Sequence, residues 1–123
     1  MKKHILMLLF LICSIQANTF DKEVTLAKDY GLAYCLNTFY QTAPSNDIAV
    51  AQNMYFQAMT IGLDAYKNIQ HYIKKYMSSN HVYDINPDSP TENEPVYFIM
   101  CLDMYHSKEF HSMIEKIVRD IIH

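Results

Sequence analysis

The sequence lacks most of the local signatures that mark enzymes. It has only two glycines and no tryptophan among its 123 residues. Gly31 and Gly62 stand far apart, so no glycine-rich loop is present to hold a phosphate. HExxH and CxxC pairs, which mark zinc sites, are also absent. We therefore expect no catalytic residues, no cofactor and no local metal site. An enzyme whose Cys/His or metal site is assembled from distant residues stays open as an alternative.

Clusters of basic residues are missing as well. The chain has 10 Lys and Arg against 13 Asp and Glu, which gives a formal net charge of −3. Nucleic acids and anionic membrane surfaces attract basic patches, so this balance argues against both as partners.

Long apolar runs are absent except near the N-terminus. Ile5 to Ile15 is apolar and follows Lys2 and Lys3, with the small residue Ala17 after it. A membrane span needs about 20 apolar residues, so the run is too short to be one. It has the pattern of a cleaved signal peptide. We expect residues 1–17 to be removed, leaving residues 18–123 as a single exported domain that is soluble and does not span a membrane.

One short segment does contain reactive residue types. Cys101, Asp103 and His106 are groups found in cysteine hydrolases and in transition-metal sites. Each helical residue turns about 100°, however, so Cys101 and Asp103 would lie on opposite faces of a helix. A catalytic thiol needs an adjacent base and an open pocket, whereas Cys101 lies in the apolar run FIMCL. We expect Cys101 to be buried and structural.

The number of cysteines also indicates a structural role for Cys101. Loss of the signal peptide removes Cys13 and leaves Cys35 and Cys101. An even pair in an exported chain is first interpreted as a disulfide. The sequence predicts a Cys35–Cys101 bond.

Apolar residues recur at helical spacing through the rest of the chain. The clearest case is the C-terminal segment, where apolar residues follow Phe110 at intervals of 3, 4, 7, 8 and 11. Strand-like alternation is absent. We predict an all-α compact bundle of about five helices with one long acidic, proline-containing loop over residues 79–95. The expected helices are Asp21–Tyr40, Asp47–Met59, Leu63–Met77, Val96–Tyr105 and Ser107–Ile122.

The second of these helices is apolar almost all the way round. Such a helix lies either at the centre of a bundle or in a subunit interface. We expect a homodimer, because one small bundle cannot cover all of this apolar surface. Met54, Phe56 and Ile61 are the residues expected nearest the contact.

Three segments of the chain resemble a known family. "KDYGLAYCL", "GLDAYKNI" and "MCLDMYHSKEF", in an exported all-helical chain, resemble the amidase-immunity proteins of bacterial type VI secretion. The resemblance implies a small helical dimer in the periplasm. It also implies that the protein binds and blocks a peptidoglycan-cleaving amidase effector delivered by neighbouring or sister cells. The alternative is a non-catalytic helical module of the envelope that binds a ligand or a protein.

If the resemblance holds, the partner would look like a papain-type Cys/His amidase. Its cleft would accept an extended, anionic peptide, which a protruding acidic loop could mimic. Prolines in the loop would lower the entropy lost on ordering it. The alternative is a solvated connector. The residues expected to bind the partner are an aromatic anchor and four charges: Tyr83, Asp84, Asp88, Glu92 and Glu94.

Overall fold

The structure is a computed structural model of the chain. It describes the backbone of residues 2–40, 46–90 and 92–122, and the side chains of these residues from 19 onward.

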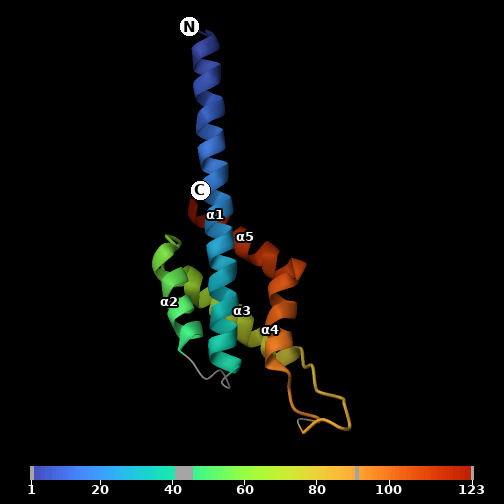
Figure 1. The fold of residues 1–123 in the computed structure, drawn as a ribbon. Helices are drawn as coiled ribbons and strands as arrows, with labels where there is room; N and C mark the ends of the chain where they lie inside the picture. Colours follow the sequence, from blue (N-terminus) through green and yellow to red (C-terminus); the bar gives the residue numbers. More distant parts are fainter. Residues whose placement is uncertain (1, 41–45, 91, 123) are drawn as a thin grey trace.

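The residues that the structure describes form five helices, as the sequence predicts (Figure 1). Within the described residues there is no β-sheet, only one isolated bridge between Tyr83 and Pro95. The all-α fold class is thus confirmed. The helices are α1 (Lys2–Phe39), α2 (Asp47–Ala58), α3 (Gly62–Ser79), α4 (Tyr97–His106) and α5 (Lys108–Ile122).

The bounds of α2 to α5 agree with the predicted ranges within two residues, but α1 begins well before Asp21. No glycine or proline lies between the N-terminal apolar run and Asp21, so nothing in the sequence breaks the helix there. Figure 1 shows the N-terminal part of α1 extending beyond the other helices. Among the described residues, no helix is long and apolar enough to cross a membrane.

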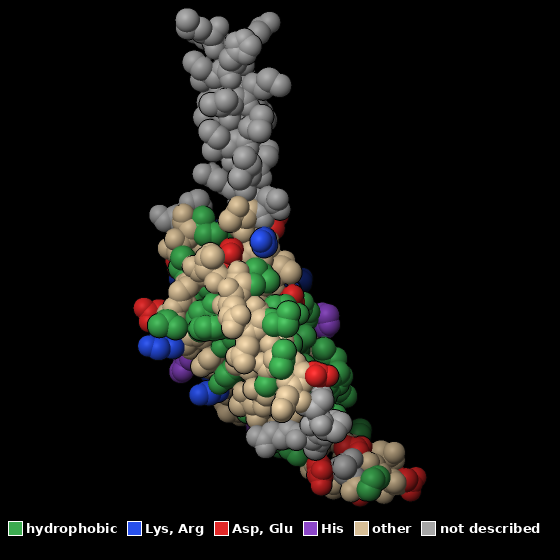
Figure 2. Space-filling view, turned by 60° about the vertical axis from the view of Figure 1, so that its left-hand side comes forward, with side chains coloured by type: hydrophobic (Ala, Val, Ile, Leu, Met, Phe, Trp, Pro, Cys, Tyr) green, Lys and Arg blue, Asp and Glu red, His purple; other side chains and the backbone are tan. Residues whose placement is uncertain are grey.

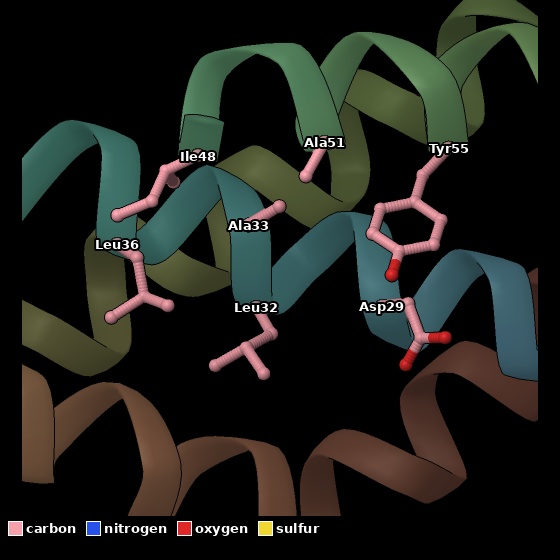
Figure 3. A pocket seen from close by; sticks show the side chains of 7 residues that line it. All are labelled: Asp29, Leu32, Ala33, Leu36, Ile48, Ala51 and Tyr55. Carbon is pink, nitrogen blue, oxygen red and sulfur yellow. The ribbon is translucent and has the colours of Figure 1, made fainter. Parts of the chain in front are cut away.

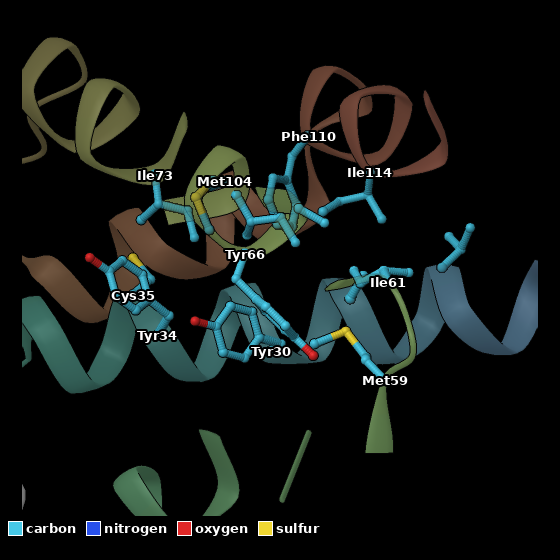
Figure 4. Packing of buried hydrophobic residues seen from close by; sticks show 14 of the residues in the cluster. Tyr30, Tyr34, Cys35, Met59, Ile61, Tyr66, Ile73, Met104, Phe110 and Ile114 are labelled. Atoms are coloured by element: carbon cyan, nitrogen blue, oxygen red, sulfur yellow. The ribbon is translucent and has the colours of Figure 1, made fainter. Parts of the chain in front are cut away.

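Helix α1 is the centre of the bundle and packs against each of the other four helices. Its buried side chains meet those of α3, α4 and α5 in one hydrophobic core (Figure 4). Gly31 lets α1 lie close to Phe110 of α5, because a Cβ atom at position 31 would lie only 2.6 Å from Cζ of Phe110. The largest fully buried side chains of the core are Tyr30, Phe110, Ile69, Ile73, Met100, Met104 and Ile114.

A disulfide joins Cys35 of α1 to Cys101 of α4, with 5.8 Å between their Cα atoms. Both residues are fully buried. The Sδ atom of Met77, near the end of α3, lies 3.6 Å from Sγ of Cys35. The bond therefore lies where α1, α3 and α4 meet.

Helix α2 is peripheral, and none of its residues is buried. Polar contacts hold its C-terminal end. The Tyr66 hydroxyl donates to the carbonyl oxygen of Phe56 at 2.7 Å. Glu23, a buried carboxylate, accepts from the backbone N–H and from the hydroxyl of Thr60, each at 3.1 Å. Gly62 then starts α3 with a φ of 79°, a left-handed conformation that favours glycine.

Candidate partner-binding site

The segment between α3 and α4 forms a protruding hairpin rather than an irregular loop (Figure 1). The backbone N–H of Val96 donates to the carbonyl oxygen of Val82 at 2.8 Å. Further out, the N–H of Asp84 donates to the carbonyl oxygen of Glu94 at 3.0 Å, and the N–H of Asn93 donates to that of Asp84 at 2.7 Å. These bonds give the projecting segment, residues 80–96, a defined base.

Local side-chain bonds shape the tip of the hairpin. Oδ1 of Asp84 accepts from the N–H of Asn86 at 3.0 Å, and Oδ1 of Asn86 accepts from the N–H of Asp88 at 3.1 Å. These are Asx turns, which satisfy backbone donors without a helix or sheet. Asn93 has a φ of 66°, a conformation that asparagine tolerates better than most residues.

The residues predicted to bind a partner all lie on this hairpin. Tyr83 is 47 % exposed, and its ring lies 5.9 Å from that of His81. Asp88, Glu92 and Glu94 are exposed, while Asp84 is half-buried because it supports the turn. Figure 2 shows acidic side chains gathered at this end of the molecule.

The sequence reasoning missed Ile85, which is 86 % exposed beside Asp84. It is the most exposed of the large hydrophobic side chains among the described residues. A single isoleucine in an acidic loop belongs to no periodic pattern, so periodicity gave no signal for it. Such a side chain on a projecting hairpin suits insertion into an apolar pocket.

The three residues expected near a dimer contact do not share one environment. Met54 is 65 % exposed, and Phe56 is 39 % exposed while its ring contacts that of Tyr66 at 4.2 Å. Ile61 is only 3 % exposed, because the turn after α2 places it in the core. Met54 and Phe56 are therefore at the surface of the chain, and Ile61 is not. Val50, one turn before Met54 on α2, is also 53 % exposed.

Cys101, Asp103 and His106 do not come together as a reactive group. Cys101 is held in the disulfide, whereas Asp103 and His106 are exposed. The turn after them is fixed by Ser107, whose hydroxyl donates to the carbonyl oxygen of Met104 and accepts from the N–H of Phe110. In the part of the chain that the structure describes, no group of three or more His, Cys, Asp or Glu is placed to hold a metal ion.

The described residues thus form a small helical bundle with a buried disulfide and a projecting hairpin. Comparison with known families shows which class of protein this is. Residues 25–114 match the family Tai4, type VI secretion system (T6SS), amidase immunity protein. The chain belongs to this family, and its role is immunity toward a type VI secreted amidase. No curated protein and no solved structure matches the chain.

Proposed function

We propose that this protein binds a cognate peptidoglycan amidase effector in the periplasm and inhibits it. The producing cell would then be protected from effector made by itself or delivered by its sister cells. The family match over residues 25–114 carries this proposal. Export is part of it: we propose that residues 1–17 are removed. Among the side chains that the structure describes, which start at residue 19, the first buried ones are Glu23 and Val24.

We further propose that the hairpin is the inhibitory element. An inhibitor of a cysteine amidase has to obstruct the cleft that receives the wall peptide. The exposed acidic side chains Asp88, Glu92 and Glu94 provide charge that resembles an anionic peptide. Ile85 and Tyr83 provide apolar surface for a pocket. The hydrogen-bonded base lowers the conformational entropy lost on binding.

A homodimer through α2 is a separate proposal. Val50 and Met54 are four residues apart, so they lie on the same face of the helix and expose adjacent apolar side chains. Covering them with the same face of a second copy would remove this surface from water. Light scattering tests the proposal, since Val50→Lys with Met54→Lys is expected to give the monomer mass. If the unaltered protein is already monomeric at micromolar concentration, the proposal fails.

The hydrogen-bond pattern provides a direct test of the hairpin. Asp84 and Glu94 are bonded neighbours, so residues 85–93 can be replaced by Asn-Gly, a pair suited to a two-residue hairpin turn. We expect this variant to keep its disulfide and its thermal unfolding temperature but to lose inhibition of the amidase in a cell-wall digestion assay. Unchanged inhibition would move the inhibitory contact to the helices.

Single substitutions separate the two parts of the hairpin. A buried anchor chiefly affects dissociation, whereas charges at the rim affect association and its salt dependence. Ile85→Ser should therefore raise the dissociation rate, and Asp88→Asn with Glu92→Gln should slow association at low salt. Ile121→Ser, at a position that is 45 % exposed on α5, is the matched control. If the protein binds no amidase at all, the result favours the alternative function, a helical module of the envelope that binds another ligand or protein.

A further inference from the structure

A second candidate site lies on the helical body, away from the hairpin. Side chains of α1 and α2 line an apolar groove with a cavity of about 190 Å³ (Figure 3). Leu32 and Leu36 extend into it from α1, and Ile48 and Ala51 come from α2. These four side chains are half-buried. The groove is open to solvent and is smaller than the cavities of about 300 to 1,000 Å³ that hold cofactors and drug-sized ligands.

One end of the groove is polar. Figure 3 shows the carboxylate of Asp29 and the hydroxyl of Tyr55 at the same end. Oδ1 of Asp29 accepts a hydrogen bond from the Tyr105 hydroxyl at 2.9 Å. A carboxylate has about four lone-pair sites, so this bond leaves most of its accepting capacity unused.

Within the described part of the chain, no salt bridge joins the carboxylate of Asp29 to a cation. The nearest basic residue in sequence, Lys28, places its Nζ over the ring of Tyr105, 4.6 Å from the ring centroid. Its charge is thus directed to the aromatic face. A half-buried carboxylate at the end of an apolar groove favours a ligand with an apolar stem and a cationic head.

We propose that this groove binds one arginine side chain of a partner protein. The aliphatic stem would lie along Leu32 and Leu36, and the guanidinium would pair with Asp29. Arginine suits the site better than lysine for two reasons. Its planar guanidinium binds carboxylates through two parallel hydrogen bonds, and it stacks on aromatic rings such as that of Tyr55.

This site is independent of the hairpin in both position and chemistry. The groove is built from α1 and α2, whereas the hairpin joins α3 to α4. The hairpin is acidic and projects into a partner, while the groove receives a basic side chain. A partner that carries an arginine at a suitable distance would be fixed at two points, which raises affinity beyond that of either contact alone. Binding of a small probe to the groove requires no partner protein, so a negative result would leave the proposed immunity mechanism untouched.

The experiment uses N-acetylarginine amide as the probe and N-acetylcitrulline amide as its uncharged isostere. Each is titrated into the 15N-labelled protein while amide chemical shifts are recorded. We expect saturable shifts at Leu32, Ala33 and Ala51 with a dissociation constant in the millimolar range for the arginine probe. Citrulline should bind at least fivefold more weakly, because it cannot form the ion pair. N-acetylleucine amide measures the contribution of the apolar stem alone.

Three variants test the assignment. Asp29→Asn keeps an acceptor for Tyr105 but removes the charge, and should weaken arginine binding about tenfold, a typical loss for one charged hydrogen-bonded contact. Ala51→Phe fills the groove and should abolish the saturable shifts. Asp103→Asn, at an exposed carboxylate on α4, is the matched control and should change nothing.

Folding is checked for every variant from the dispersion of its amide spectrum. Tyr105→Phe provides a second check, since it removes the hydrogen bond to Asp29 while leaving the carboxylate in place, and it should retain arginine binding. The proposal is overturned if no saturable shifts occur at the groove, or if citrulline binds as tightly as arginine. Unchanged binding in Ala51→Phe would equally refute it.

Discussion

The packing of α1 against α5 depends on the missing side chain of Gly31. Replacing this residue by alanine places a Cβ atom 2.6 Å from Cζ and 3.4 Å from Cε2 of Phe110, and 3.5 Å from Cγ2 of Ile69. Carbon atoms pack best at about 3.5 to 4.0 Å, so only the contact with Phe110 is in serious conflict. Phe110 is fully buried, so its ring cannot swing into solvent.

Two opposing effects decide the outcome of Gly31→Ala. In a helix interior, alanine is favoured over glycine by about 1 kcal/mol. Overpacking a well-packed core costs about 1 to 3 kcal/mol. We therefore expect Gly31→Ala to reduce the free energy of unfolding by about 1 kcal/mol, even though the same change on an exposed helix face would increase it. Gly31→Val, with a larger side chain and a smaller gain in helix propensity than alanine, should cost about 3 kcal/mol or more.

Urea denaturation followed by circular dichroism measures these changes, and a double-mutant cycle assigns them to Phe110. Phe110→Leu removes the ring atoms that meet the new Cβ and should cost about 1 to 2 kcal/mol alone. In that background Gly31→Ala should become neutral or stabilising. Asn68→Ala on the exposed face of α3 is the control for propensity. If Gly31→Ala stabilises the original protein by as much as helix propensity allows, the close approach does not constrain the core.

Three further predictions concern stability. Replacing both Cys35 and Cys101 by alanine should lower the free energy of unfolding by about 2 to 5 kcal/mol, because the disulfide closes a loop with a sequence separation of 66 residues; a thermal unfolding temperature equal to that of the oxidised protein would contradict this. Glu23→Ala should cost about 2 kcal/mol in urea denaturation, because Thr60 loses two hydrogen bonds to a charged acceptor, and Glu23→Gln should cost less. Burial, followed by the hydrogen bond to Asp29, raises the pKa of the Tyr105 hydroxyl above its usual 10.0. The stability that this protonated hydroxyl contributes is therefore fully present below pH 10 and is lost as the pH rises through the higher pKa of the folded state. Tyr105→Phe should accordingly flatten the decline of the unfolding temperature at alkaline pH. An unchanged slope would count against this assignment.

Features of the fold that depend on the type and spacing of residues could be predicted from the sequence. The apolar positions of α5 follow one helix face, and the structure buries Phe110, Ile114 and Val118 from that face. Cys35 and Cys101, the two cysteines that remain when Cys13 is set aside, form the disulfide. In both cases the signal is contained in the type and spacing of the residues themselves.

Positions that depend on how the chain turns in space were harder to predict. Ile61 was placed near a dimer contact because it follows an apolar helix, but the left-handed turn at Gly62 directs the chain so that Ile61 joins the core. Ile85 shows the converse, since nothing in the sequence distinguishes an exposed isoleucine from one folded under a loop. Its exposure follows from the hairpin, where Asp84 is hydrogen-bonded to Glu94 and to Asn93.

The disulfide and the hairpin are linked by position. Cys101 belongs to α4, which follows the hairpin, and Met77, in contact with Cys35, belongs to α3, which precedes it. The bond thus fixes α4 against α1, and the contact between Met77 and Cys35 places α3 beside it. A hairpin on a fixed base loses less entropy when it enters a cleft than one on mobile helices. In the proposed complex, the disulfide would therefore favour partner binding through the geometry of the hairpin base, in addition to its effect on the stability of the fold.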